Sequence, residues 1–366
     1  IKEGINMSVK ILVINPGSTS TKVALFKKTE NVIQNNLTHS AEEIAKFERV
    51  SDQLEMRQAL IEDWMKEEGY QLSDLEAVVG RGGLLRSMPG GTYEVTSKMK
   101  EDLIAAHRGE HASNLGGLIA DKIAEKAGVK SYIVDPVAVD EFEDIARISG
   151  IPQIERISLG HALNVKAVGR RAAKELGKGL DEVNLIVAHI GGGISICPLR
   201  KGKAIDYNNA NEMGPFSPER TGGLPCGDLV KLCFSGKYTL AEMKKKISGK
   251  GGLVAYLGTN DAREVQKLID AGDEKAKLIF SAMAYQIAKE IGQMATVLKG
   301  EVDAIVMTGG VSYSENLTNQ VKEMVSFIAP YMVIPGEDEM LALAEGTVRV
   351  LNSEEKAKIY ENEVKL

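Results

Sequence analysis

The sequence feature that most constrains the fold is a short hairpin with a glycine-containing tip, which occurs twice. The first copy, Ile11–Phe26, reads ILVINPGSTSTKVALF, in which two apolar runs of strand type flank an Asn-Pro-Gly turn. The second copy, Asn184–Leu199, reads NLIVAHIGGGISICPL and has three glycines at its tip. Asn15 and His189 hold corresponding strand ends, 174 residues apart (189 − 15), close to half of the 366-residue chain. We therefore predict an internal duplication that produces two domains of similar design.

Two further apolar runs also end in glycines, at Ala77–Gly83 (AVVGRGG) and Ala304–Gly310 (AIVMTGG). Between the strand-type runs, apolar residues recur at helical spacing over Glu42–Glu68, Leu115–Ala127 and Asp273–Lys299. Strands that alternate with helices are typical of layered α/β domains. We therefore expect an α/β fold.

No low-complexity linker separates the two halves of the chain. We place the domain boundary near Gly150-Ile151-Pro152, which interrupts the pattern of strands and helices. This predicts an N-terminal domain over residues 1–155 and a C-terminal domain over residues 156–344. The final helix, at about 345–366, is expected to return to the first domain.

The composition excludes several classes of protein. Lys and Arg number 45 against 51 Asp and Glu, so the net charge of −6 argues against nucleic acid or an anionic membrane as a partner. No apolar run approaches the length that crosses a bilayer. Cys197, Cys226 and Cys233 lack metal-type spacing. They are typical of reduced thiols, so we expect a cytoplasmic protein.

Glycine-rich turns at strand ends favour a nucleotide-binding cleft. Glycine lets main-chain N–H groups approach a phosphate closely, and four such turns occur. The alternative is that Asn-Pro-Gly and Gly-Gly-Gly only close tight hairpins. The sequence contains no P-loop, no dinucleotide-binding G-x-G-x-x-G after a strand and no protein-kinase signature. If the chain binds ATP, paired hairpins must hold it.

Charged residues beside these glycines are candidates for catalysis. Arg81 in GRGG and Arg220 in PERTGG suit bidentate capture of a carboxylate or phosphate, although each could be a surface arginine on a loop. Asp135, in YIVDPVAVD, suits Mg²⁺ or water at a strand end, although Asp-Pro also begins ordinary turns.

Three histidines stand beside small residues, in EHASNLGG (His111), GHALN (His161) and AHIGGG (His189). A single histidine of this kind is more often structural than catalytic. Three of them next to glycines favour a site lined for an anion. The absence of H-E-x-x-H and of clustered cysteines argues against zinc.

The strings INPGSTSTKVALF, VVGRGG, GEHASNLGGLIADKIA, VDPVAVDEF, GHALN, AHIGGGIS and TGGVSYSENL together resemble the acetate kinase family, and most of all its butyrate kinase (branched-chain fatty acid kinase) branch. The similarity runs from Ile11 to about Leu343. It implies two duplicated actin-like ATPase (ribonuclease H-like) domains with the active site in the cleft between them. It also implies reversible, Mg²⁺-dependent phosphoryl transfer between ATP and a short-chain fatty acid, giving ADP and an acyl phosphate.

The resemblance also implies roles for individual residues. Arg81, Arg220 and His161 correspond to residues around the transferring phosphoryl group, and His111 to a substrate-site histidine. Asn15 and Asp135 correspond to residues near the phosphates and Mg²⁺. Glu339 matches a metal-associated glutamate, with Glu337 and Asp338 as alternatives in the same run. The residues that correspond to the nucleotide site, all in the C-terminal domain, are His189, Gly191, Gly192, Gly193, Asp261, Arg263, Gly309, Gly310 and Asn316.

Two glycines bear on the substrate. Gly160 stands where acetate kinases have an aromatic residue, and Gly83 where they tend to have a valine. Both changes should enlarge the acyl pocket, in which each buried methylene contributes about 0.8 kcal/mol. The resemblance therefore favours butyrate or a branched acid over acetate, and it suggests a homodimer or a larger homo-oligomer.

Alternatives stay open at this point. One is an acetate or propionate kinase. Another is a sugar kinase of the same superfold, which would need a carboxylate base, a part that Asp135 could take. An ATP-driven chaperone or filament protein would need a peptide-binding domain for which the chain has no spare length, and the retained polar residues argue against an inactive paralogue.

Overall fold

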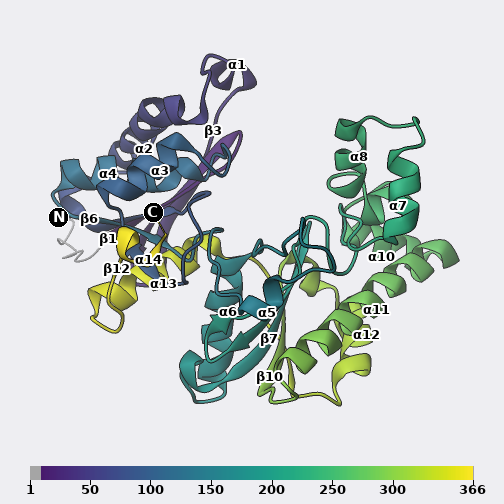
Figure 1. Ribbon diagram of the computed structural model, residues 1–366. Helices are drawn as coiled ribbons and strands as arrows, with labels where there is room; N and C mark the ends of the chain where they lie inside the picture. The colour runs from purple at the N-terminus through teal and green to yellow at the C-terminus, as the bar shows by residue number, and fades with distance from the viewer. Residues whose placement is uncertain (1–9, 366) are drawn as a thin grey trace. The chain divides into compact units, whose positions relative to one another are not determined.

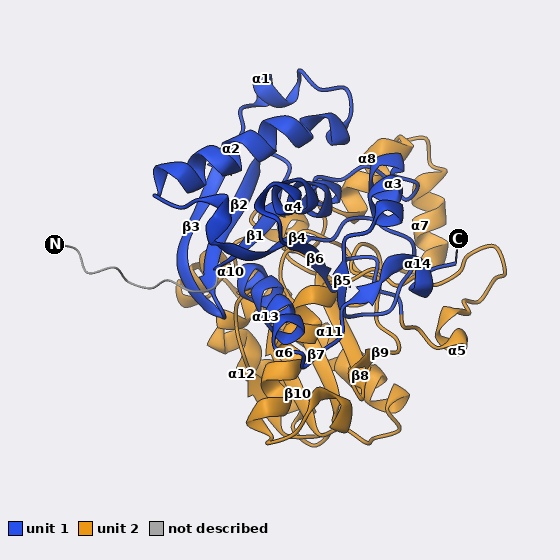
Figure 2. Cartoon of the chain, turned by 90° about the vertical axis from the view of Figure 1, so that its left-hand side faces the viewer, with its two compact units in different colours: residues 1–140, 338–366 blue, residues 141–337 orange. Residues whose placement is uncertain are grey.

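The computed structural model describes residues 10–365, and its chain divides into two compact units. Unit 1 comprises residues 1–140 and 338–366, and unit 2 comprises residues 141–337 (Figure 2). Each unit is built on one mixed β-sheet with helices on both faces (Figure 1).

The sheet of unit 1 has the strand order β12-β5-β6-β4-β1-β2-β3. Strands β1, β2 and β3 form an antiparallel meander, whereas β4 and β6 run parallel to β1. The strands are β1 Lys10–Pro16, β2 Ser20–Lys27, β3 Glu30–Thr38, β4 Leu75–Arg81, β5 Thr92–Glu94, β6 Lys130–Val134 and β12 Lys358–Ile359.

The sheet of unit 2 has the strand order β11-β10-β7-β8-β9. Strands β7, β8 and β9 are antiparallel, and β10 and β11 run parallel to β7. The strands are β7 Asn184–Ile190, β8 Ile194–Arg200, β9 Lys203–Ala204, β10 Ala304–Thr308 and β11 Tyr331–Val333.

The two sheets repeat one design, which confirms the predicted duplication. The order β3-β2-β1-β4-β6 matches β9-β8-β7-β10-β11 in position and in direction. Strands β1 and β7 each have seven residues and begin 174 residues apart (184 − 10). Asn15 and His189 are therefore both the sixth residue of the first strand in their units.

The helices of unit 1 are α1 Ala41–Ile44, α2 Leu54–Glu67, α3 Ser97–Ala105, α4 Asn114–Ala127, α13 Glu339–Leu351 and α14 Tyr360–Glu363, with short 3-10 turns at Val50–Gln53 and Leu72–Asp74. The prediction of one helix over Glu42–Glu68 is wrong. Helix α1 ends at Ile44, and Asp52 then accepts the backbone N–H of Arg49 and begins a new turn. Arg49 also bonds Glu110, so a distant contact breaks the helical pattern.

Helices α4 and α13 cover opposite faces of the first sheet (Figure 1). Glycines allow α4 to lie directly on β4, because a Cβ atom on Gly80 would come within 2.0 Å of the carbonyl oxygen of Gly116. On the other face, Gly346 of α13 packs against Val134, where a Cβ atom would lie 2.5 Å from the valine side chain. Both contacts let a helix pack closely on the sheet near the carboxyl ends of β4 and β6.

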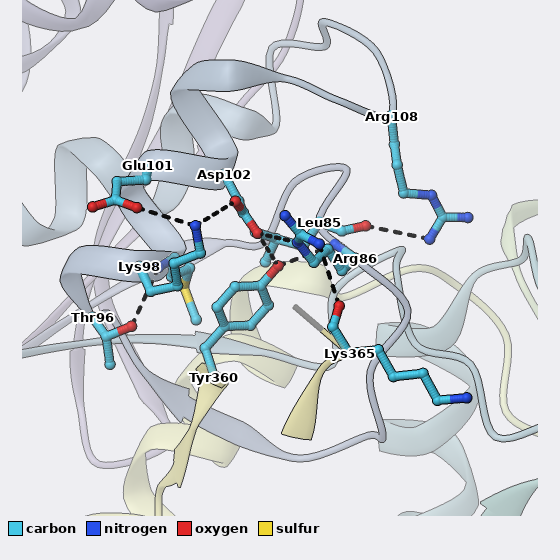
Figure 3. Close-up of polar contacts among 10 residues, drawn as sticks. Leu85, Arg86, Thr96, Lys98, Glu101, Asp102, Arg108, Tyr360 and Lys365 are labelled. Atoms are coloured by element: carbon cyan, nitrogen blue, oxygen red, sulfur yellow. Dashed lines mark hydrogen bonds and ion pairs between the residues drawn. The ribbon is translucent and has the colours of Figure 1, made fainter. Parts of the chain in front are cut away.

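The end of the chain is bound to unit 1 by a buried polar cluster (Figure 3). The Tyr360 hydroxyl donates to Oδ2 of Asp102 at 2.9 Å, and Nε of Arg86 donates to the same oxygen at 2.6 Å. The backbone N–H of Arg86 donates in turn to the Tyr360 hydroxyl at 3.2 Å. Strand β12 thereby completes the edge of the sheet beside β5.

Helices also cover both faces of the second sheet. Leu185 and Val187 of β7 pack under α6, and the alternate residues Ile186 and Ala188 pack under α11. The helices of unit 2 are α5 Asp144–Arg147, α6 Ala162–Glu175, α7 Cys226–Cys233, α8 Leu240–Ile247, α9 Gly252–Leu257, α10 Ala262–Asp270, α11 Glu274–Val297 and α12 Glu315–Val325, with 3-10 turns at Leu180–Glu182 and Gly310–Tyr313.

The units divide after Asp140 and Glu337, whereas the sequence analysis placed the divisions after residues 155 and 344. The first boundary lies earlier than predicted because residue 141 already contacts unit 2. The Glu141 carboxylate accepts from Nζ of Lys166 at 2.5 Å and from the backbone N–H of Ala204 at 2.7 Å, so it is bound to unit 2. Within residues 10–365, none of the helices combines the length and apolar character needed to cross a bilayer.

Candidate functional site

Unit 2 contains a cavity of about 1220 Å³ whose wall comes chiefly from three separate stretches of the chain, with Pro218, Glu219 and Glu337 completing it. The tip of the β7–β8 hairpin, the start of α10 and the loop between β10 and α12 line it. Six of the residues predicted to bind nucleotide lie in its wall, namely Gly191, Gly192, Asp261, Arg263, Gly310 and Asn316.

Three other residues predicted for this site lie behind the wall. Gly309 has a φ of +90°, and a Cβ atom there would lie 2.3 Å from the carbonyl oxygen of Ile190, so only glycine fits this approach. His189 is buried beneath the hairpin tip, and Gly193 faces Arg220. These residues shape the cavity without lining it.

Polar side chains around the cavity form hydrogen bonds with one another. Arg263 donates from Nε and Nη2 to the Asp261 carboxylate at 3.0 and 2.7 Å, and this contact lowers the pKa of Asp261 to about 2. Nδ2 of Asn316 donates to Gln266 at 2.8 Å. Gln266 was not predicted from the sequence, although it lies one helical turn from the start of α10 and could have been found from that spacing.

The loop between β9 and α7 packs on the hairpin tip. Oγ of Ser217 donates to the carbonyl oxygen of Gly192 at 2.6 Å and accepts the backbone N–H of Arg220 at 3.1 Å. Nη1 of Arg220 donates to the carbonyl oxygen of Ala210 at 2.8 Å, and burial lowers the pKa of this arginine. A Cβ atom on Gly193 would lie 2.1 Å from Nη1. The arginine therefore lies directly against the glycine tip.

Two of the three predicted histidines are stacked in unit 2. The rings of His161 and His189 lie 4.0 Å apart between centroids and are tilted by 17°. Nδ1 of His161 is 3.0 Å from Oγ of Ser195, and Nδ1 of His189 is 2.8 Å from Oδ1 of Asn164. His161 is the residue immediately before α6, so the first turn of that helix sets its position.

Glu337 lies in the cavity wall beside His189, with Oε1 3.1 Å from Nε2 of the imidazole. The pKa of Glu337 is lowered to about 2, chiefly by its hydrogen bond with His189. Oε1 would also lie 2.7 Å from a Cβ atom on Gly191. The sequence analysis considered Glu337 only as an alternative for the metal.

Unit 1 carries a second cluster, in which Arg81 and Asn15 both contact Glu339. Nη1 of Arg81 donates to Glu339 at 2.9 Å, and Nδ2 of Asn15 donates to the same oxygen at 2.7 Å. The three residues come from the ends of β4 and β1 and from the first residue of α13. His111 lies near enough that burial and, to a smaller extent, the positive charge of Arg81 lower its pKa.

Asp135 follows β6 and bonds the backbone of a neighbouring loop. Its Oδ1 accepts the N–H of Gly91 at 2.7 Å, and its own N–H donates to the Gly91 carbonyl oxygen at 3.0 Å. Its φ of +37° is strained for a residue with a side chain. Across residues 10–365, no three His, Cys, Asp or Glu side chains gather closely enough to hold a metal ion by themselves.

The two glycines predicted to enlarge an acyl pocket have another explanation. A Cβ atom on Gly160 would lie 2.6 Å from Cε2 of Tyr207, so the tyrosine ring already fills this space. A Cβ atom on Gly83 would lie 2.3 Å from Oδ1 of Asn114. Each glycine therefore allows a close contact within its own unit, and the larger acyl pocket stays a prediction.

Solved structures show which class of fold this is. The acetate kinase of Porphyromonas gingivalis matches with a TM-score of 0.77 and 21% identity over 93% of this chain and 99% of that one. A propionate kinase from Francisella tularensis matches with a TM-score of 0.71 and 21% identity over 92% of this chain and 98% of that one. The duplicated sheets thus have the actin-like ATPase fold of these carboxylate kinases.

The chain belongs to the acetokinase family, whose family model matches residues 158–361. It is 55% identical to "Probable butyrate kinase 2" of Caldanaerobacter subterraneus over 96% of this chain and 99% of that protein. It is 54% identical to "Butyrate kinase 2" of Clostridium acetobutylicum over 97% of this chain and 100% of that protein. The resemblance found in the sequence is confirmed.

Proposed function

We propose that this protein is a butyrate kinase, which transfers a phosphoryl group reversibly between ATP and the carboxylate of butyrate or a branched short-chain fatty acid. The observation that carries the proposal is the match, over nearly the whole chain, to relatives named butyrate kinase. Membership of the acetokinase family supports ATP and ADP as the nucleotides.

The cavity in unit 2 is the nucleotide site in this proposal. Gly191, Gly192 and Gly310 place no side chain in this wall, so the backbone can approach an anion closely. Asp261, Arg263 and Asn316 line the rest of the wall and would contact the nucleoside. His189 and Gly309 would support this surface from behind.

The nucleophile is the carboxylate of the fatty acid, which is already ionised at pH 7 and needs no general base. The protein must therefore align the reactants and stabilise negative charge on the phosphoryl oxygens. Arg220, His161 and Arg81 are the groups that we propose for this task, and His111 would contact the acid. The burial of Arg220 strengthens its interaction with an anion, because little water competes.

The residues of unit 1 fit a magnesium ion. The Glu339 carboxylate and the amide oxygen of Asn15 are ligands of the type that Mg²⁺ takes; Nδ2 of Asn15 holds the two side chains together at 2.7 Å, and the Glu339 side chain keeps 24% of its surface exposed. Mg²⁺ in kinases is commonly held by one or two carboxylates together with water and phosphate oxygens. Glu339 and Asn15, with Asp135, would hold it, and the bound ion would neutralise charge on the phosphates.

The experiment that tests the proposal is an ATP-dependent acyl-hydroxamate assay with acetate, propionate, butyrate, isobutyrate, isovalerate and valerate. We expect acyl phosphate with kcat/KM highest for a four-carbon or branched acid, and Arg220→Ala should abolish most of it. ADP release with sugars but no hydroxamate with any acid would overturn the proposal. The family resemblance also supports a homodimer or a larger homo-oligomer, which light scattering would measure.

A further inference from the structure

The ring of His161 is fixed by two neighbours from the β7–β8 hairpin. Oγ of Ser195 lies 3.0 Å from Nδ1, and the His189 ring stacks on one face. Ser195 is directly opposite His189 in the β7–β8 ladder, so one pair of strands carries both contacts. The position of the His161 ring therefore depends on β8, the second strand of the hairpin, as well as on α6.

Ser195 is only 1% exposed, and within residues 10–365 its hydroxyl makes no hydrogen bond except the one to His161. A buried hydroxyl with a single partner donates its proton wherever that partner can accept it. Nδ1 of a neutral imidazole can accept only when the ring proton is on Nε2. The environment of Ser195 thus selects one of the two tautomers.

We propose that Ser195 is a positioning residue that holds His161 as the Nε2–H tautomer. The inference rests on the proposed function, in which His161 faces the transferring phosphoryl group. In this tautomer, Nε2–H donates to a phosphoryl oxygen. The opposite tautomer would turn a lone pair towards the anion and repel it. The hydroxyl thus affects the reaction only through the imidazole.

The backbone behind His161 is shaped to keep this contact. A Cβ atom on Gly160 would lie 3.1 Å from Oγ of Ser195 and 2.6 Å from the Tyr207 ring. The Tyr207 hydroxyl is 2.8 Å from Oγ of Ser158, which fixes the ring on the other side of the same loop. Gly160 therefore lets the loop lie close enough for Ser195 to reach Nδ1.

The test combines nitrogen NMR with kinetics on the full-length protein. Long-range ¹H–¹⁵N spectra report the tautomer of each histidine, and His161→Gln assigns the signals. We expect wild-type His161 to be the Nε2–H tautomer and Ser195→Ala to give a mixture. Ser195→Thr keeps a hydroxyl and should restore the wild-type pattern. Ser131→Ala removes a buried strand serine that bonds Asp121 in unit 1, and it serves as the matched control.

Kinetics separate positioning from general structural damage. Ser195→Ala should lower kcat roughly 10- to 100-fold while the KM for ATP stays within about twofold. In a His161→Ala background the same change should cost no further activity, because its effect passes through the imidazole. An Nδ1–H tautomer in the wild type, or an additive loss in the double variant, would overturn the inference. A wild type that makes no acyl phosphate would contradict the proposed function alone, since the spectra need no turnover.

Discussion

Arg220 lies against Gly193, at the tip of the hairpin that lines the cavity. A Cβ atom on this glycine would come within 2.1 Å of Nη1 and 2.6 Å of Cζ of the guanidinium group. The adjacent Gly192 is different, because its nearest neighbour would be the flexible Glu219 side chain at 3.4 Å. Arg220, which we propose contacts the phosphoryl group, can therefore occupy this position only because residue 193 has no side chain.

This contact predicts different effects for two neighbouring substitutions. Gly193→Ala should lower kcat by roughly 100-fold, because it displaces Arg220 from its position and removes its stabilisation of the transferring group. Gly192→Ala leaves Arg220 in place, so it should lower kcat much less than Gly193→Ala does; because Gly192 lines the proposed nucleotide site, its effect should fall on the KM for ATP. Steady-state kinetics with butyrate and ATP measure both. Equal activities of the two variants would contradict the placement of Arg220.

Glu339→Gln tests the cluster in unit 1. The substitution keeps the shape of the side chain but removes the charge that Arg81 and Asn15 contact. We expect a fall in kcat of at least about tenfold and a higher Mg²⁺ concentration for half-maximal rate. Glu76→Gln, an exposed residue of β4, is the control. An unchanged Mg²⁺ titration for Glu339→Gln would remove this residue from the metal site.

The contact between Gly160 and Tyr207 predicts an effect on stability. Gly160→Ala should destabilise the protein by about 1–3 kcal/mol, because its methyl group overlaps the tyrosine ring. Tyr207→Ala frees that space, so Gly160→Ala should be less damaging in that background. Thermal unfolding of the four proteins measures the coupling. If Gly160→Ala instead left the Tm unchanged and altered the preference among acids, the open-pocket explanation would be right after all.

The Tyr360 cluster shown in Figure 3 predicts a loss of stability at alkaline pH. Burial is the main cause that raises the pKa of Tyr360 to about 12 from an ordinary value of 10.0. The neutral phenol therefore contributes stability below pH 10, and this contribution is lost as the pH rises from 10 to about 12. Denaturant unfolding of wild type and Tyr360→Phe across this range measures the difference.

Tyr360→Phe should itself cost about 1–3 kcal/mol at neutral pH, because the hydroxyl no longer bonds Asp102. Its unfolding free energy should then fall less steeply than that of the wild type between pH 10 and 12. Parallel curves for the two proteins would show that Tyr360 does not titrate with the shifted pKa.

Local signals in the sequence predicted the parts of the fold that local chemistry determines. The hairpins of β1–β2 and β7–β8 follow from short apolar runs and glycine turns, and the long helix α11 follows from its Asp273 cap. The break before α2 could not be predicted in this way, because it depends on a contact between Arg49 and Glu110, 61 residues away.

In the candidate site too, local sequence signals predicted some residues, whereas others depend on contacts with distant parts of the chain. Gly191, Gly192 and Gly310 could be predicted because glycine turns follow four separate strand-type runs, a repetition that favours a phosphate site. The space beside Gly160 could not, because the residue that fills it is 47 positions further along the chain (207 − 160). Glu337 was visible only as one of three adjacent acids, and its contact with His189 depends on the pairing of β10 with β7.

The measurement that tests the central claim most directly is ³¹P NMR of the reaction with butyrate that carries ¹⁸O in both carboxylate oxygens. If the carboxylate attacks the γ-phosphorus of ATP, one labelled oxygen becomes the bridge of butyryl phosphate. The account predicts an acyl phosphate signal with the upfield isotope shift of a P–¹⁸O bond, together with ADP. Consumption of ATP without an acyl phosphate signal, or an acyl phosphate without that shift, would contradict it.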